Sequence, residues 1–137
     1  PLNIGDAADD LVGYSTSDGA SASGEGLVQF GDPTRMADTR DSFPFARLGV
    51  RTPRTLDVEP AGSAILQNVT VTRTSGPGWV ATYPPSAGTP EISTVNFTGA
   101  GQTRAVLAFT KDDPNGDVSY ESLVPTDLVV DLIGTFS

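Results

Sequence analysis

Two residue types central to enzyme chemistry are missing from this sequence, because it contains neither cysteine nor histidine. The lack of cysteine excludes disulfides, thiolate metal sites and a cysteine nucleophile. The lack of histidine removes the commonest general base and the commonest ligand of transition metals. No stretch has the length or apolar density of a membrane span, and no signal peptide is recognisable. We therefore expect no catalytic residue, no metal ion and no cofactor.

Long uninterrupted segments are also scarce, because 15 glycines and 11 prolines are spread over 137 residues. Helices of ordinary length do not fit between breakers of this frequency in most of the chain. The length suits a single domain with a real hydrophobic core. About eight short strands, spaced roughly ten residues apart, predict an all-β protein, either an antiparallel β-sandwich or a barrel.

The clearest strand is residues 64–74, where apolar and polar side chains alternate. Four residues share one face of it: Ile65, Gln67, Val69 and Val71. We expect this strand to form a hairpin with residues 79–83. Residues 105–110 are apolar on both faces, which is typical of a central strand. The other expected strands are 27–30, 56–58, 92–98, 118–123 and 128–136.

Charge is distributed unevenly around a net value of −9. Residues 1–32 hold six acidic residues and no basic one, whereas residues 35–54 hold five of the eight basic residues. An acidic surface repels phosphate, so neither nucleic acid nor an anionic membrane is expected as a partner. We divide the chain into an acidic, Gly/Ser-rich N-terminal arm, residues 1–32, and a β-domain, residues 33–137.

The N-terminal arm, residues 1–32, has two interpretations. It is either a flexible tail or an arm that becomes ordered when the chain joins an assembly. The second interpretation depends on scattered apolar side chains that are able to contact a partner: Leu2, Ile4, Leu11, Val12 and Tyr14. Residues 15–26 contain only small and acidic residues and read as a linker or an exposed loop.

An arginine-containing segment after the arm is expected to act as a structural staple, a set of ion pairs that fixes it to the last strand. The predicted staple comprises Arg35, Asp38, Thr39, Arg40, Asp127 and Asp131. Asp131 lies inside an apolar run, and a carboxylate buried there needs a positive neighbour. We expect one of the two arginines to pair with one of the two strand aspartates, because a guanidinium suits such a pair. Replacing Asp131 with alanine would then cost about 3–5 kcal/mol. A catalytic pair of Asp38 and Asp131 is the less favoured alternative, since it needs a cleft and a raised pKa.

Two further patterns have a structural and a functional interpretation. Trp79 and Tyr83 share one strand face, where exposed rings would form a sugar-binding platform and inward rings would belong to the core. We favour the core. Residues 112–117, DDPNGD, place the side-chain oxygens of Asp113, Asn115 and Asp117 at alternate positions, as calcium loops do. The glycine is misplaced for an EF-hand and position 124 is valine, so an ordinary hairpin turn is the better interpretation.

Six short motifs occur in a fixed order: RMADTR from Arg35, NVTVT from Asn68, GWVATYP from Gly78, STVNF from Ser93, GQT from Gly101 and DLVVDLIGTF from Asp127. In this order they resemble a β-domain common in exported and surface proteins of actinobacteria. The resemblance covers about residues 33–137 and implies an all-β, non-catalytic accessory module. Members of that family often have two cysteines where this chain has Pro85 and Ser119, so folding here does not require an oxidising compartment.

These patterns favour a non-enzymatic structural protein on the exterior of a multi-subunit assembly. The assembly would be a phage virion, with the chain as a decoration or fibre protein, or a cell-surface layer or filament. Arm and strand contacts would join it to copies of itself or to other subunits. The expected location is the virion surface or the extracellular side of a cell; Pro1 and the missing cysteines lean towards the virion. The alternatives are a secreted module that binds carbohydrate or a cell surface, with surface glycans as partners, and, more remotely, a carboxylate-only enzyme.

Overall fold

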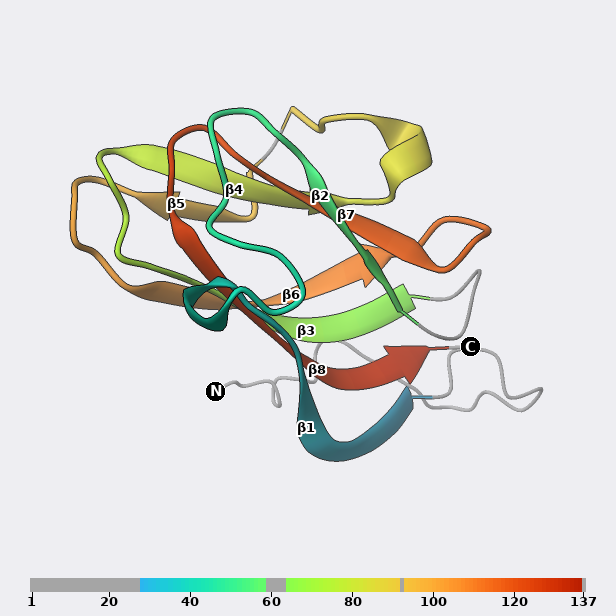
Figure 1. Ribbon diagram of the computed structural model, residues 1–137. Helices are drawn as coiled ribbons and strands as arrows, with labels where there is room; N and C mark the ends of the chain where they lie inside the picture. The colour runs from blue at the N-terminus through green and yellow to red at the C-terminus, as the bar shows by residue number, and fades with distance from the viewer. Residues whose placement is uncertain (1–27, 59–63, 92, 137) are drawn as a thin grey trace.

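The computed structural model describes residues 28–58, 64–91 and 93–136, which form eight strands in two antiparallel four-stranded sheets (Figure 1). The first sheet has the order β1 (Val28–Asp38), β8 (Asp127–Phe136), β3 (Ala64–Thr72), β6 (Arg104–Lys111). The second sheet has the order β2 (Arg54–Asp57), β7 (Asp117–Ser122), β4 (Gly78–Tyr83), β5 (Val95–Phe97). Two short 3-10 helices accompany them, η1 (Thr39–Asp41) and η2 (Pro85–Ala87). The sheets do not close on each other, so the predicted all-β fold is confirmed as a sandwich rather than a barrel. No helix among the described residues is long and apolar enough to cross a membrane.

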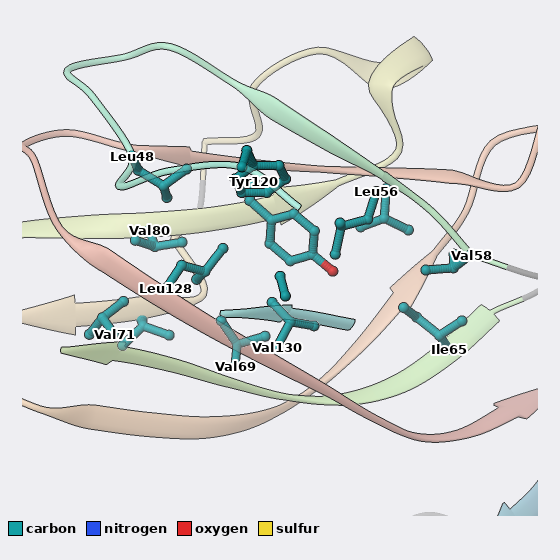
Figure 2. Packing of buried hydrophobic residues seen from close by; sticks show 14 of the residues in the cluster. Leu48, Leu56, Val58, Ile65, Val69, Val71, Val80, Tyr120, Leu128 and Val130 are labelled. Carbon is teal, nitrogen blue, oxygen red and sulfur yellow. The ribbon is translucent and has the colours of Figure 1, made fainter. Parts of the chain in front are cut away.

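The hydrophobic core lies between the two sheets, as Figure 2 shows. In β3 the burial alternates residue by residue, so the predicted inward face is confirmed. Side chains from both sheets and from the loop that carries Leu48 fill the core: Leu48, Leu56, Val58, Ile65, Val69, Val71, Val80, Tyr120, Leu128 and Val130. Each fully buried side chain of this size contributes about 1.5–3 kcal/mol, and this burial supplies the main stabilisation of the sandwich.

One polar side chain, Gln67 of β3, is fully buried within this core. The Tyr120 hydroxyl of β7 donates a hydrogen bond to Gln67 Oε1 over 2.6 Å. Gln67 Nε2 donates to Thr110 Oγ1 of β6 at 2.9 Å and to Thr82 Oγ1 of β4 at 3.2 Å. Burial raises the pKa of Tyr120 well above its ordinary value, so its hydroxyl stays a donor. The amide therefore joins strands of both sheets and fixes how they lie against each other.

The predicted hairpin between residues 64–74 and 79–83 is wrong, because β3 and β4 belong to different sheets. β3 pairs with β8 on one side and with β6 on the other, which leaves no edge for β4. Arg73, directly after β3, has a φ of 52°, a left-handed conformation that ends the ladder. The chain then crosses the sandwich, and a glycine-proline turn suits that crossing as well as it suits a hairpin.

Two further predictions about strands are corrected by the structure. β1 continues through Gly31–Pro33, beyond the expected end of the strand at residue 30, with register shifts on either side of Thr34–Arg35. The domain boundary placed after Asp32 therefore falls within a strand. Residues 105–110 form most of β6, which is an edge strand rather than a central one. The apolar arm residues Leu2, Ile4, Leu11, Val12 and Tyr14 lie outside the described residues.

Candidate functional site

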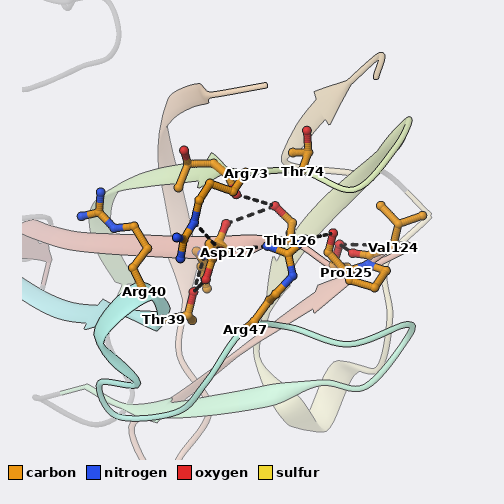
Figure 3. A network of polar contacts seen from close by, with 12 residues as sticks. Thr39, Arg40, Arg47, Arg73, Thr74, Val124, Pro125, Thr126 and Asp127 are labelled. Atoms are coloured by element: carbon orange, nitrogen blue, oxygen red, sulfur yellow. Dashed lines mark hydrogen bonds and ion pairs between the residues drawn. The ribbon is translucent and has the colours of Figure 1, made fainter. Parts of the chain in front are cut away.

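Asp127, at the first position of β8, is a buried carboxylate whose side chain is only 3% exposed. It accepts hydrogen bonds from Thr39 Oγ1 at 2.7 Å, Arg47 Nη1 at 2.8 Å and Arg73 Nε at 2.9 Å (Figure 3). Burial opposes its ionisation, but these donors outweigh burial and hold the pKa of Asp127 below its ordinary value. Because the donors come from η1, from the loop before β2 and from the turn after β3, one carboxylate fixes three segments to β8.

A second ion-pair group surrounds Asp38, the buried residue that caps η1. Arg40 donates to it through Nε at 2.8 Å and Nη2 at 2.7 Å, and these bonds lower the pKa of Asp38 to about 2. Arg35 Nη1 lies 3.3 Å from the same carboxylate. Arg35 also makes a two-pronged pair with Asp131, with Nε to Oδ1 at 2.6 Å and Nη2 to Oδ2 at 3.3 Å. One guanidinium therefore bridges β1 and β8.

The structure brings all six residues of the predicted staple together, with one difference in pairing and one in burial. Arg35 binds Asp131, but Arg40 binds Asp38 rather than an aspartate of β8. Asp131 is 19% exposed on the outside of the first sheet, so the deeply buried carboxylate is Asp127 instead. Strand alternation places both aspartates on the same face, and only the position of η1, which covers one of them, distinguishes the two. Arg47 and Arg73 were not predicted as part of the staple, because no local pattern in the sequence shows where their loops lie.

A third buried carboxylate, Glu121 of β7, lies on the outer side of the second sheet. Its Oε1 accepts hydrogen bonds from the Tyr83 hydroxyl at 2.7 Å and from Thr89 Oγ1 at 2.6 Å, and Arg51 pairs with its Oε2. Burial opposes the ionisation of Glu121, but bonds from Thr89, Arg51 and Tyr83 lower its pKa overall. The Arg51 guanidinium also lies 5.3 Å from the centre of the Trp79 ring. Glu121 therefore holds the segment after η2 and the loop before β2 against the sheet.

This arrangement corrects the expectation that Trp79 and Tyr83 face the core between the sheets. Val80 faces that core, while Ala81, which lies between the two rings on their face, is the register partner of Glu121. Tyr83 is buried, but on the outer side of the second sheet, and burial raises its pKa. Trp79 is half-buried beside Arg51. Neither ring offers the open flat face that a sugar platform needs.

Residues 112–117 form a tight turn that the Asp113 carboxylate stabilises through hydrogen bonds to backbone N–H groups. Asp113 Oδ1 accepts hydrogen bonds from the N–H groups of Asn115 at 2.8 Å and Asp117 at 2.9 Å. Gly116 has a φ of 82°, which glycine adopts without strain. The predicted turn is confirmed, although it joins β6 of one sheet to β7 of the other and so does not close a hairpin. No group of three or more acidic side chains in the described ranges is arranged to hold a metal ion.

The outside of the first sheet carries an apolar area, which we call the outer patch. It consists of Leu66, Leu107, Phe109 and Phe136. Leu107 and Phe109 are 53% and 57% exposed, although they lie two residues apart on one strand. The Phe109 and Phe136 rings meet edge to face with centroids 4.6 Å apart, and Leu66 is the register partner of Phe109. Clustered exposed side chains of this size are typical of interaction surfaces.

No family model matches this chain, and comparisons with curated proteins and with solved structures also gave no match. The resemblance to the actinobacterial β-domain therefore remains a hypothesis from the sequence motifs. In the structure, the first and last of those motifs lie side by side as the end of β1 with η1 and as β8, joined by the Arg35–Asp131 pair.

Lowering the pH from about 5 to about 2 is expected to destabilise the fold. Asp38, Asp127 and Glu121 have lowered pKa values, so the unfolded chain binds more protons than the folded chain across this window. Their stabilisation is complete above the ordinary carboxyl pKa of about 4 and disappears as the pH falls through the folded values. Asp117, whose pKa is raised by burial, contributes with the opposite sign.

Urea unfolding at several pH values measures this loss directly. The variant Asp38→Asn is the control, because it should show a shallower pH dependence in the same range. A free energy of unfolding that stays constant from pH 5 to pH 2 would contradict the expectation.

Proposed function

We infer that this protein is a non-enzymatic structural subunit on the exterior of a multi-subunit assembly, and that the outer patch is buried against a neighbouring subunit. The observation that carries the proposal is the pair of adjacent, more than half-exposed side chains Leu107 and Phe109 on an edge strand. Water contact with two such side chains is unfavourable, and a partner that covers them recovers about 25 cal/mol per Å² of apolar area. A virion surface and a cell-surface layer or filament are the two settings we propose.

The ion-pair networks also support the structural role, because their buried carboxylates hold loops in place. Among the described residues, the carboxylates of Asp38, Asp127 and Glu121 are buried and fully engaged with arginine and hydroxyl donors. Each network fixes loops to the sandwich, and none of these three side chains has a raised pKa of the kind that a general acid uses. The buried ion pairs therefore stabilise the sandwich that carries the outer patch.

The carbohydrate-binding alternative depended on Trp79 and Tyr83. The Tyr83 ring is buried and its hydroxyl donates a hydrogen bond to Glu121, while the Arg51 guanidinium lies over the Trp79 ring. A sugar would have to displace both the arginine and the segment that carries Thr89 to reach a flat ring. The geometry therefore favours the subunit role over a glycan-binding module.

Replacing both Leu107 and Phe109 with serine tests the proposal. The double variant is expected to self-associate at least about tenfold more weakly than the native chain, because clustered apolar anchors dominate the stability of interfaces. Its fold should persist, since both side chains are largely in water in the single chain. Sedimentation velocity over a range of protein concentrations measures the association.

Phe43→Ser supplies the matched control, because Phe43 is similarly exposed, at 49%, but lies beside η1 rather than on the outer patch. This variant should associate like the native chain. A native chain that stays monomeric at every concentration, or a double variant that assembles normally, would refute the proposal.

A further inference from the structure

No described strand neighbours β6 at the edge of the first sheet. Within the described ranges β6 pairs only with β3, so the N–H and C=O groups along its other side have no strand partner. Edge strands with this property accept an additional strand unless charges, prolines or bulges blunt them. The middle of β6, AVLAFT, contains none of those features.

Both ends of β6 carry a cation that the rest of the described chain does not neutralise. Five of the eight basic residues form ion pairs: Arg35, Arg40, Arg47, Arg51 and Arg73. Arg54 lies over the Phe45 ring at 4.9 Å. The remaining two, Arg104 and Lys111, are exposed and form no ion pair with a described residue. The free edge therefore presents exposed apolar side chains between two unmatched positive charges.

The complement of such an edge is an extended segment that combines apolar and acidic side chains, and this chain contains one. Residues 1–14 hold three aspartates, Asp6, Asp9 and Asp10, together with the apolar residues Leu2, Ile4, Leu11, Val12 and Tyr14. No basic residue occurs before Arg35, so nothing in this segment would repel Arg104 or Lys111. Eight residues of β6 extend over about 27 Å, and 14 extended residues reach about 45 Å, so the segment is long enough to cover the whole edge.

We propose that residues 1–14 of a second copy add to β6 as an extra strand and complete the first sheet. The inference rests on the proposed function and names the partner of the same surface. Backbone hydrogen bonds would supply the pairing, apolar side chains would cover Leu107 and Phe109, and the aspartates would neutralise Arg104 and Lys111.

The position of β1 favours a second copy over the same chain. β1 and β6 lie at opposite edges of the first sheet, about 14 Å apart across three strand spacings. A segment that returned to its own β6 would have to pass over or around the sheet, whereas the β6 edge of a second copy can be reached without crossing it. Because the donor segment and the accepting edge are different surfaces, successive copies would join head to tail, as a ring or an open filament.

Site-specific cross-linking tests the proposal, since the native chain has no cysteine to interfere. Two full-length variants, Ile4→Cys and Ala105→Cys, are mixed, one of them with a tag that changes its mass, and treated with a bismaleimide. A cross-linked heterodimer is expected. Asn96→Cys is the matched acceptor control, because Asn96 is exposed on β5, the edge of the other sheet, and should cross-link only at background level.

Charge reversal gives a second readout in the same assay. Adding Arg104→Glu and Lys111→Glu to the acceptor should reduce the cross-linked fraction at least about fivefold, because like charges then face each other. Changing Asp6, Asp9 and Asp10 of the donor to lysine should restore it. Circular dichroism verifies that the exposed substitutions leave the fold intact.

The outcomes separate the inference from the proposed function. Equal cross-linking to the 105 and 96 positions, or no effect of charge reversal, overturns the inference. So does an intramolecular product from the double variant Ile4→Cys/Ala105→Cys in place of the heterodimer, because the edge would then be filled by its own chain. If sedimentation shows association that depends on Phe109 in these samples but no cross-link forms, the proposed function stands and the inference fails. If the chains are monomeric, both fail.

Discussion

Replacing Asp127 with alanine is expected to lower the free energy of unfolding by about 3 kcal/mol. The change removes the acceptor of three side-chain hydrogen bonds, from Thr39, Arg47 and Arg73. The Thr39 hydroxyl, which also accepts from the Leu128 N–H at 2.9 Å, would keep only that backbone contact. Because both arginines are substantially exposed and regain water, the loss should fall at the lower end of the range for a broken buried ion pair.

Asp131→Ala, on the same strand, is the matched control. Its carboxylate is partly exposed and its partner Arg35 is about half-exposed, so the expected loss is about 1 kcal/mol or less. This value replaces the larger one expected from the sequence, which assumed that Asp131 was the buried residue. Urea unfolding of both variants at neutral pH gives the comparison, and equal losses would show that Asp127 does not hold the loops.

Replacing Gln67 with leucine is expected to cost about 2–3 kcal/mol, although leucine has a similar volume and creates no large cavity. The loss arises because the buried hydroxyls of Tyr120 and Thr110 would lose their partner in the core. A buried polar group without a hydrogen bond is costly, whereas an apolar pair in the same place is not. Thermal or urea unfolding measures the change.

A double-mutant cycle with Tyr120→Phe distinguishes this mechanism from a packing defect. Removing both the amide and the hydroxyl should recover about 1 kcal/mol or more relative to the sum of the single losses. Additive losses would mean that the 2.6 Å bond between Tyr120 and Gln67 contributes little to the stability of the sandwich.

The sequence predicts most of the strands of this fold, but it does not predict which strands pair with one another. Alternation along β3 predicts its two faces correctly, because strand geometry places successive side chains on opposite sides. The assignment of β3 and β4 to different sheets depends on contacts between distant segments, and the same turn residues serve a hairpin or a crossing. For the same reason the sequence of β6 predicts a central strand, because residues that are apolar on both faces are expected inside a sheet. Only the strand order shows that β6 is an edge strand, and only the exposure of Leu107 and Phe109 shows that its outer face is open to water.

The polar residues likewise include some that the sequence predicts and others whose position depends on distant segments. A carboxylate in an apolar strand needs a cation, so the sequence predicts a pair between Arg35 or Arg40 and one of the β8 aspartates, and the structure shows which pair forms. The burial of Glu121 depends on the segment that brings Thr89 over β7, and no local pattern places that segment. Its one sequence signal is an acidic residue in the middle of a short β-strand, beside the buried positions Tyr120 and Ser122.

The choice of basic residues has a practical consequence. Every ion pair among the described residues is made by arginine, and the chain's one lysine, Lys111, stands at the end of β6. Acylating reagents that attack amines spare guanidinium groups, so they would leave the buried carboxylates and their partners untouched. The rate at which Lys111 is acylated, followed by mass spectrometry of the unaltered chain, becomes a chemical footprint of whether this margin of the sandwich is bare or occupied.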